Sequence, residues 1–94
     1  MTVQVLLPRL LSECTGGRTS MAVDLPAPGT VGALLDAVAA VHPVFGRRVR
    51  DETGALRRHV NVYVDGEEVR RLSGLATPVP AGAEVMVVQS VAGG

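Results

Sequence analysis

The sequence predicts an α+β fold in which a mixed sheet of four to five strands is covered by one main helix. Two observations support this. Apolar residues alternate near both ends and in the middle of the chain, and residues 31–42 carry apolar residues at helical spacing. The predicted order is β-β-α-β-β-β, a two-layer arrangement of one helix on a sheet. The 94 residues suffice for a single modest core.

The first two strands are predicted from a period of two residues. Every second residue between 2 and 7 is apolar, and Pro8 then interrupts the pattern. Gly16 and Gly17 provide a turn, and residues 19–25 alternate again. The residues expected to face the core are Val3, Val5, Leu7, Met21, Val23 and Leu25.

The main helix is predicted to begin after Thr30, which follows the helix-breaking segment PAPG and is placed as an N-cap. Its apolar stripe has the spacing i, i+3, i+4, i+7 and consists of Val31, Leu34, Leu35, Val38 and either Val41 or His42. Pro43 ends this helix. A short helical turn around residues 44–49 and a loop through Gly54 are expected next.

The second half of the chain contains the clearest strand signal. Val60, Val62 and Val64 are expected to face inward, and the Asp65-Gly66 turn should lead to a short return strand through Val69. The last strand is predicted at residues 84–90, with Val85 and Val87 on one face and Met86 and Val88 on the other. If this strand lies centrally, beside the first, the chain end leaves from the middle of the sheet.

Composition excludes several functions. The formal charge is zero, so no overall field attracts nucleic acid or an anionic membrane, and Phe45 and Tyr63 are the only aromatic residues. Cys14 is the only cysteine, which excludes an internal disulfide and a thiolate cluster. Asp65, Glu67 and Glu68 match no metal-ligand spacing, and we expect no metal site. Without a recognisable signal peptide or a long apolar stretch, a cytoplasmic location is expected.

The sequence ends in Gly93-Gly94, directly after an apolar run. Glycine lacks a Cβ, so such a tail can enter a narrow channel and present the carboxylate of Gly94. Four extended residues reach about 13–14 Å. We therefore expect a globular domain at 1–90 and a flexible Gly-Gly tail at 91–94.

Three segments, "HVNVYVDGEEVR", "GLATPVPAGAEVMVV" and the terminal "VAGG", together with the order of elements, make the chain resemble the ubiquitin-like β-grasp sulfur carriers of the ThiS/MoaD group. Within that group, the resemblance is greatest to the carriers of cysteine biosynthesis. The resemblance implies a protein substrate and not an enzyme. It implies that an E1-like activating enzyme of the MoeB/ThiF type adenylates Gly94 with ATP, and that sulfide or an enzyme persulfide then produces a thiocarboxylate.

The same resemblance assigns roles to the last residues. Gly94 would bear the adenylate and then the sulfur, Gly93 would let the tail enter, and Val91 and Ala92 would make positioning contacts. No bound cofactor is implied. The sulfur would pass to a biosynthetic enzyme such as a cysteine synthase-like sulfhydrylase.

Met86 and Val88 point away from the predicted core, and with Tyr63 they are interpreted as a docking patch for the activating enzyme. The alternative is scattered surface residues, which are normal. The pairs Arg57-Arg58 and Arg70-Arg71 are solvated in one interpretation and meet an acidic partner in the other.

Other functions stay open at this point. The chain could donate sulfur to molybdopterin, thiamin or a sulfur-containing natural product, because the acceptor chemistry belongs to the partner. It could be a ubiquitin-like modifier that joins Gly94 to lysines of other proteins, or a small subunit whose tail completes a partner's site. The sequence does not decide the pathway, the oligomeric state or the role of Cys14.

Overall fold

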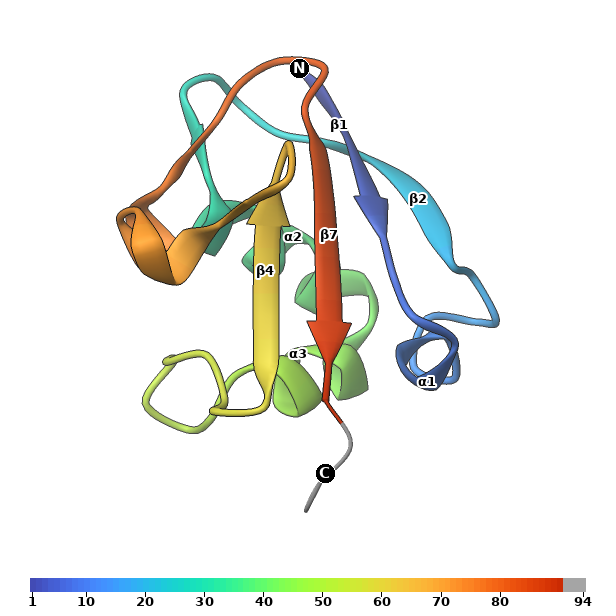
Figure 1. Cartoon of the computed structure of the whole chain (residues 1–94). Helices are drawn as coiled ribbons and strands as arrows, with labels where there is room; N and C mark the ends of the chain where they lie inside the picture. Colours follow the sequence, from blue (N-terminus) through green and yellow to red (C-terminus); the bar gives the residue numbers. More distant parts are fainter. Residues whose placement is uncertain (91–94) are drawn as a thin grey trace.

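The computed structural model describes residues 1–90. Five strands form one mixed sheet in the order β2-β1-β7-β4-β5, and the helices α2 and α3 lie on one of its faces (Figure 1). The strands of this sheet are β1 (Thr2–Leu6), β2 (Ser20–Asp24), β4 (Val60–Val64), β5 (Glu67–Glu68) and β7 (Glu84–Gln89). A second sheet pairs β3 (Gly29–Thr30) with β6 (Pro78–Val79). The helices are α1 (Arg9–Ser12), α2 (Val31–Val41) and α3 (Pro43–Val49), and the 3-10 turns are η1 (Val69–Arg71) and η2 (Gly74–Ala76).

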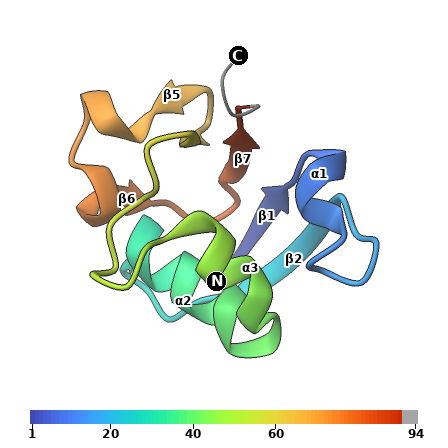
Figure 2. The ribbon, with the colours of Figure 1, turned by 90° about the horizontal axis from the view of Figure 1, so that it is seen from below.

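The last strand, β7, occupies the centre of the sheet, a position that the sequence had left conditional. It runs parallel to β1, with Val85 opposite Val5, and antiparallel to β4, with Val87 opposite Val62. Both edges of β7 are therefore hydrogen-bonded, and its carboxyl end lies in the middle of the sheet (Figure 2). This confirms the predicted β-grasp class with a mixed five-stranded sheet.

The core lies between this sheet and the two longer helices. The predicted alternation holds on all three central strands, because every inward residue of β1, β4 and β7 is buried. Phe45 of α3 is completely buried and fills the space between the helices and the sheet. The inward residues of the central strands are Val3, Val5, Val60, Val62, Val64, Val85 and Val87, and those of α2 are Val31, Leu34, Leu35 and Val38.

Helix α2 begins where predicted. The Thr30 Oγ1 accepts a hydrogen bond from the backbone N–H of Ala33 at 3.1 Å, and Pro43 separates α2 from α3. The buried stripe of α2 ends at Val38 and does not include Val41, which was one of the two predicted last residues and is 72% exposed. Gly46 lets α3 approach α2 closely: a Cβ on Gly46 would lie 2.7 Å from the Cβ of Ala39.

Several short elements were not predicted, among them the β3–β6 pair and η2. The segment after Pro8 forms the one-turn helix α1, in which the N–H groups of Leu11 and Ser12 both donate to the Pro8 carbonyl. The return strand ends at Glu68 and not at the predicted Val69, and the chain continues as η1. This turn directs the side chain of Val69 into the core, where it is fully buried. The expectation of one main helix holds for α2, with α1 and α3 as shorter additions. Within residues 1–90, no helix has the length and apolar character needed to cross a membrane.

Candidate functional site: an apolar sheet face beside the chain exit

The sheet face opposite the helices carries a row of apolar side chains across its three central strands. The register places Leu6 of β1 opposite Met86 of β7, and Met86 opposite Tyr63 of β4. Their sequence neighbours Val5, Val85, Val87, Val62 and Val64 are buried on the inner face, so these three side chains lie on the outer face. Met86 is 40% exposed, and Leu6 and Tyr63 are half-buried.

Val88 extends this row toward the end of β7. A shallow groove of about 240 Å³ is lined by Leu6, Pro8, Met86 and Val88, together with the neighbouring residues Leu7 and Val87. We call the residues Leu6, Tyr63, Met86 and Val88 the outer patch. The structure thus brings together all three residues that the sequence predicted for docking. Whether they bind a partner stays a prediction.

Leu6 and Pro8 were not predicted as part of this surface. The available signal was Leu6 itself, an apolar residue at an outward position of an alternating strand. Alternation alone could not show that Leu6 and Met86 are neighbours, because they are far apart in the sequence. Their contact follows from the parallel pairing of β1 with β7.

The point where the chain leaves the sheet is held on the β4 side. The Ser90 N–H donates to the His59 carbonyl at 2.8 Å, so the pairing of β7 with β4 continues to the last described residue. Arg70 in turn holds the start of β4: its guanidinium donates to the Arg57 carbonyl at 2.9 Å and to the Val60 carbonyl at 2.5 Å. Arg70 also bonds the side chain of Asn61. The end of β7 is therefore held by the start of β4, which Arg70 holds in turn.

Basic groups lie on the β4 side of this point. A hollow of about 610 Å³ beside the start of β4 is lined by Arg57, Arg58, His59 and Arg70, together with Leu56 and Asp51. Of the two arginine pairs in the prediction, Arg70 and Arg57 both donate to backbone carbonyls within the chain, and the Arg57 Nε–H bonds the Arg47 carbonyl at 2.9 Å. Arg58 is exposed and makes no ion pair with any residue between 1 and 90.

Asp51 closes the loop between α3 and β4. Its carboxylate accepts hydrogen bonds from the Thr53 hydroxyl at 2.5 Å, the Thr53 N–H at 2.9 Å and the Ala55 N–H at 3.2 Å. The Thr53 hydroxyl bond, supported by the two N–H bonds, lowers the pKa of Asp51 below its usual value. The residues that follow this loop, Arg57 and Arg58, line the hollow described above, as does Asp51 itself.

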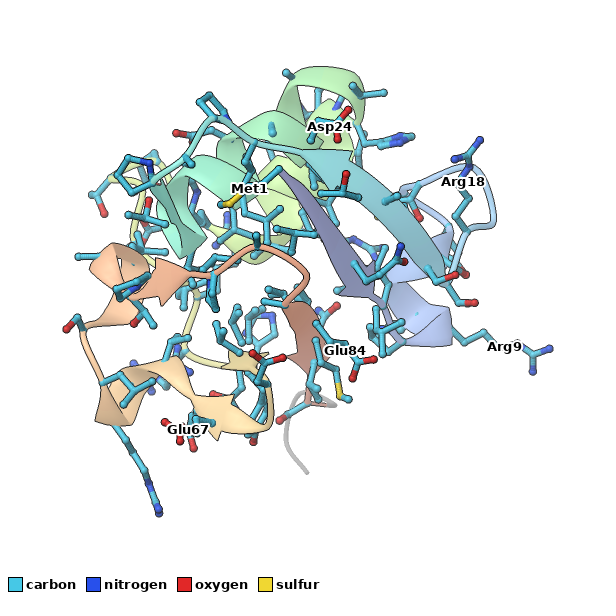
Figure 3. The ribbon with its side chains drawn as sticks, turned by 90° about the horizontal axis from the view of Figure 1, so that it is seen from above. Met1, Arg9, Arg18, Asp24, Glu67 and Glu84 are labelled. Atoms are coloured by element: carbon cyan, nitrogen blue, oxygen red, sulfur yellow. The ribbon has the colours of Figure 1, made fainter. Side chains whose placement is uncertain are left out.

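One acidic residue of the β4–β5 turn, Asp65, has a structural role. The Asp65 carboxylate accepts the Glu84 N–H at 3.0 Å, which joins the turn to the start of β7. Figure 3 shows Glu84 at the start of β7 and Glu67 on β5, and both are exposed. The described part of the chain contains no group of three potential metal ligands.

Cys14 is half-buried and packs against the core. Four predicted site residues, Val91, Ala92, Gly93 and Gly94, lie outside the described residues. Their predicted roles remain predictions.

Comparisons with known proteins agree with this fold. The sequence profile of the ThiS family matches residues 5–94. The sulfur carrier protein CysO of Mycobacterium tuberculosis is 36% identical over 96 residues, with both chains fully covered. The crystal structure of Mycobacterium tuberculosis CysO superimposes with a TM-score of 0.84, covering 95% of this chain and 99% of that one.

Two further relatives broaden the picture. Small archaeal modifier protein 1 of Haloferax volcanii is 37% identical over 84 residues, which cover 89% of this chain and 91% of the relative. A structure of the BexX/CysO complex of Amycolatopsis orientalis contains a chain that is 35% identical, with a TM-score of 0.82 and coverage of 98% and 99%.

These relatives are carrier and modifier proteins by name, in agreement with the expectation of a protein substrate and not an enzyme. The full-length identity to CysO, the profile match and the mixed β-grasp sheet all point to one conclusion. The chain belongs to the ThiS family of ubiquitin-like β-grasp proteins and is related to the sulfur carriers.

Proposed function

We propose that this protein carries sulfur as a thiocarboxylate on Gly94. The Gly94 carboxylate attacks the α-phosphorus of ATP in an E1-like activating enzyme, which forms an acyl-adenylate and releases pyrophosphate. Hydrosulfide then attacks the acyl carbon and AMP leaves, so that one carboxylate oxygen is replaced by sulfur. A sulfur-accepting biosynthetic enzyme takes the sulfur in a later step.

The central position of β7 is the observation that carries this proposal. Both edges of β7 are paired, and its pairing with β4 extends to Ser90. The residues that follow Ser90 therefore start from a fixed point of the fold. A partner that binds the globular part therefore also positions the chain end in its active site. This positioning favours adenylation, because the reacting groups are held close together.

The outer patch provides a surface for this binding. It lies on β1, β4 and β7, the last of which leads directly to the chain end. An apolar patch bordered by polar groups is typical of protein–protein contacts. In the proposal, the activating enzyme covers the outer patch while the tail enters its ATP site.

Cysteine synthesis is the proposed destination of the sulfur, because the full-length relative is a CysO protein. The acceptor would be a sulfhydrylase of the cysteine synthase type. Thiamin, molybdopterin and sulfur-containing natural products remain alternative destinations. Since the activation step consumes ATP, we propose that the carrier works in the cytoplasm. We also propose that it has no cofactor of its own, because the activating enzyme uses the ATP and the sulfur source.

Intact-mass spectrometry tests this proposal. The purified protein is incubated with ATP, sulfide and a MoeB/ThiF-type activating enzyme from the same genome. The expected result is a mass increase equal to the exchange of one oxygen for sulfur, which disappears when Gly94 is deleted. Absence of the increase, with an activating enzyme that loads its own known carrier in parallel, would overturn the proposal.

A second function has support from one comparison. The similarity to small archaeal modifier protein 1 favours a role in which Gly94 is joined to lysines of other proteins. The chain contains no lysine, so it could not form chains on itself. Thiol-resistant conjugates that a deconjugating protease removes would be evidence for this role.

A further inference from the structure

Strand β2 is an open edge of the five-stranded sheet. It pairs only with β1, and the opposite edge, β5, is just two residues long. In Figure 1, β2 forms the outer border of the sheet, and no other element of residues 1–90 lies along it. The segment Ser20–Asp24 contains neither proline nor a basic residue, which are common devices for blocking an edge.

The hydrogen bonds of β2 show which backbone groups are free to pair. The Leu25 N–H donates to the Met1 carbonyl, and the Met1 amino group donates to the Leu25 carbonyl. At the other end of the pair, the Leu7 N–H donates to the Thr19 carbonyl at 2.8 Å. In an antiparallel pair the bonded positions alternate, so the odd-numbered residues of β2 face β1. The N–H and C=O groups of the even-numbered residues therefore point outward from the edge, and these residues are Ser20, Ala22 and Asp24.

An apolar groove accompanies this edge on the inner face of the sheet. It has a volume of about 320 Å³ and lies between β2 and α2, where its apolar lining includes Met21, Val23, Ala37 and Val41. Val41 is the most exposed large apolar side chain within residues 1–90. The groove would be covered if the sheet continued beyond β2.

The charges along β2 make the edge complementary to itself. Arg18 precedes the strand, Asp24 ends it, and Figure 3 shows the two at opposite ends. Arg18 is exposed and forms no ion pair with the described residues. In an antiparallel pair of two β2 strands centred on Ala22, Ser20 lies opposite Asp24 of the partner subunit. Arg18 then lies diagonally across from Asp24 of the partner subunit, within reach of its carboxylate.

We propose that two copies of this protein associate through β2, antiparallel and centred on Ala22, to form a two-fold dimer with one continuous sheet. Met21 then faces Val23 of the partner subunit on the inner side, and the two α2 helices approach each other and cover Val41. Because the contact is the same on both copies, it closes as a dimer and does not propagate. Two short strands make a small interface, so the dimer is weak and depends on concentration.

This pairing leaves the candidate site accessible. Strand β1 separates β2 from β7, and the outer patch lies on the opposite face from the α2 groove. Loading of the chain end and formation of the dimer are therefore independent, and the inference does not rest on the proposed function.

Sedimentation velocity of the full chain, from about 1 µM to about 1 mM, tests the proposal across the range of weak affinities. We expect the wild-type protein to dimerise at the upper end. The variants Arg18→Asp and Asp24→Arg should each raise the dimer dissociation constant about tenfold or more, because each places like charges across the two-fold axis. An equimolar mixture of these two variants should dimerise again, since every contact in the mixed dimer then joins opposite charges.

A backbone variant provides a second test. Ala22→Pro removes an outward N–H without removing a bond to β1, whereas Ala22→Thr retains it, so only the proline variant should stay monomeric. Circular dichroism verifies that the variants are folded. A wild-type protein that is monomeric at about 1 mM would overturn the proposal. So would a dimer that Ala22→Pro leaves intact, or one that the mixed charge variants fail to restore.

Discussion

Tyr63 of β4 and Met86 of β7 stand directly opposite each other on the outer face of the sheet, although their predicted link was only a shared outward direction. Leu6 of β1 lies on the other side of Met86. Met86 is thus the centre of the outer patch. Since centrally placed apolar residues contribute most to binding at protein interfaces, the first prediction concerns this residue.

The substitution Met86→Asp should weaken recognition by the activating enzyme. A carboxylate at the centre of an apolar contact loses its hydration on binding, which costs about 2 kcal/mol or more. We expect the apparent KM for the carrier in an ATP–pyrophosphate exchange assay to rise by at least tenfold, about 1.4 kcal/mol. Val44→Asp is the matched control, because Val44 is similarly exposed, at 48% against 40% for Met86, but lies on α3. Equal effects of the two substitutions would refute a docking role for the outer patch.

Replacement of Arg70 by Gln should loosen the strand end beside the chain exit. The shorter neutral side chain loses the contacts with the Arg57 and Val60 carbonyls, and we expect a loss of about 1 kcal/mol in the free energy of unfolding. Hydrogen exchange of the Ser90 amide, which donates to His59, should accelerate more than exchange in β1. Arg71→Gln is the control, since the side chain of Arg71 is exposed and makes no hydrogen bond within residues 1–90, unlike that of Arg70. Unchanged Ser90 exchange in Arg70→Gln would disprove the bracing role.

The Asp51 loop should make stability depend on pH in the acidic range. Hydrogen bonds from Thr53 and Ala55 lower the pKa of Asp51 in the folded protein below its ordinary value of 3.8. The unfolded state therefore binds this proton more tightly, so the stabilisation is fully present above pH 3.8 and is lost as the pH falls through the folded pKa. Urea titrations of wild type and Asp51→Asn between neutral and acidic pH measure this effect. We expect their stability difference to shrink as the pH falls. A constant difference would contradict the assignment.

Loss of the cap at the start of α2 should destabilise the fold. Thr30→Ala removes the acceptor of the Ala33 N–H, which costs about 1 kcal/mol in the free energy of unfolding. Thr30→Ser keeps the hydroxyl and should retain most of the stability. Chemical denaturation of the three proteins makes the comparison, and an alanine variant as stable as the serine variant would show that the cap does not contribute.

The strands and the main helix could be predicted from the sequence because their signals are local. Val60, Val62 and Val64 repeat every second residue, and Thr30 precedes a helical stripe, so neighbouring residues alone define these elements. The one-turn helix α1 and the turn η1 were missed. A four-residue helix is too short to show a period, and Val69 is buried by a change of backbone direction that alternation does not encode.

The sequence by itself determined which residues of the three central strands face inward, and the sign and number of the charges. Only the tertiary structure decided that β7 lies between β1 and β4, that Leu6 joins Met86 and Tyr63, and that β2 remains an open edge. The physical reason is that alternation orients a side chain relative to its own strand. Which strands become neighbours depends on how the whole chain buries its apolar faces at once.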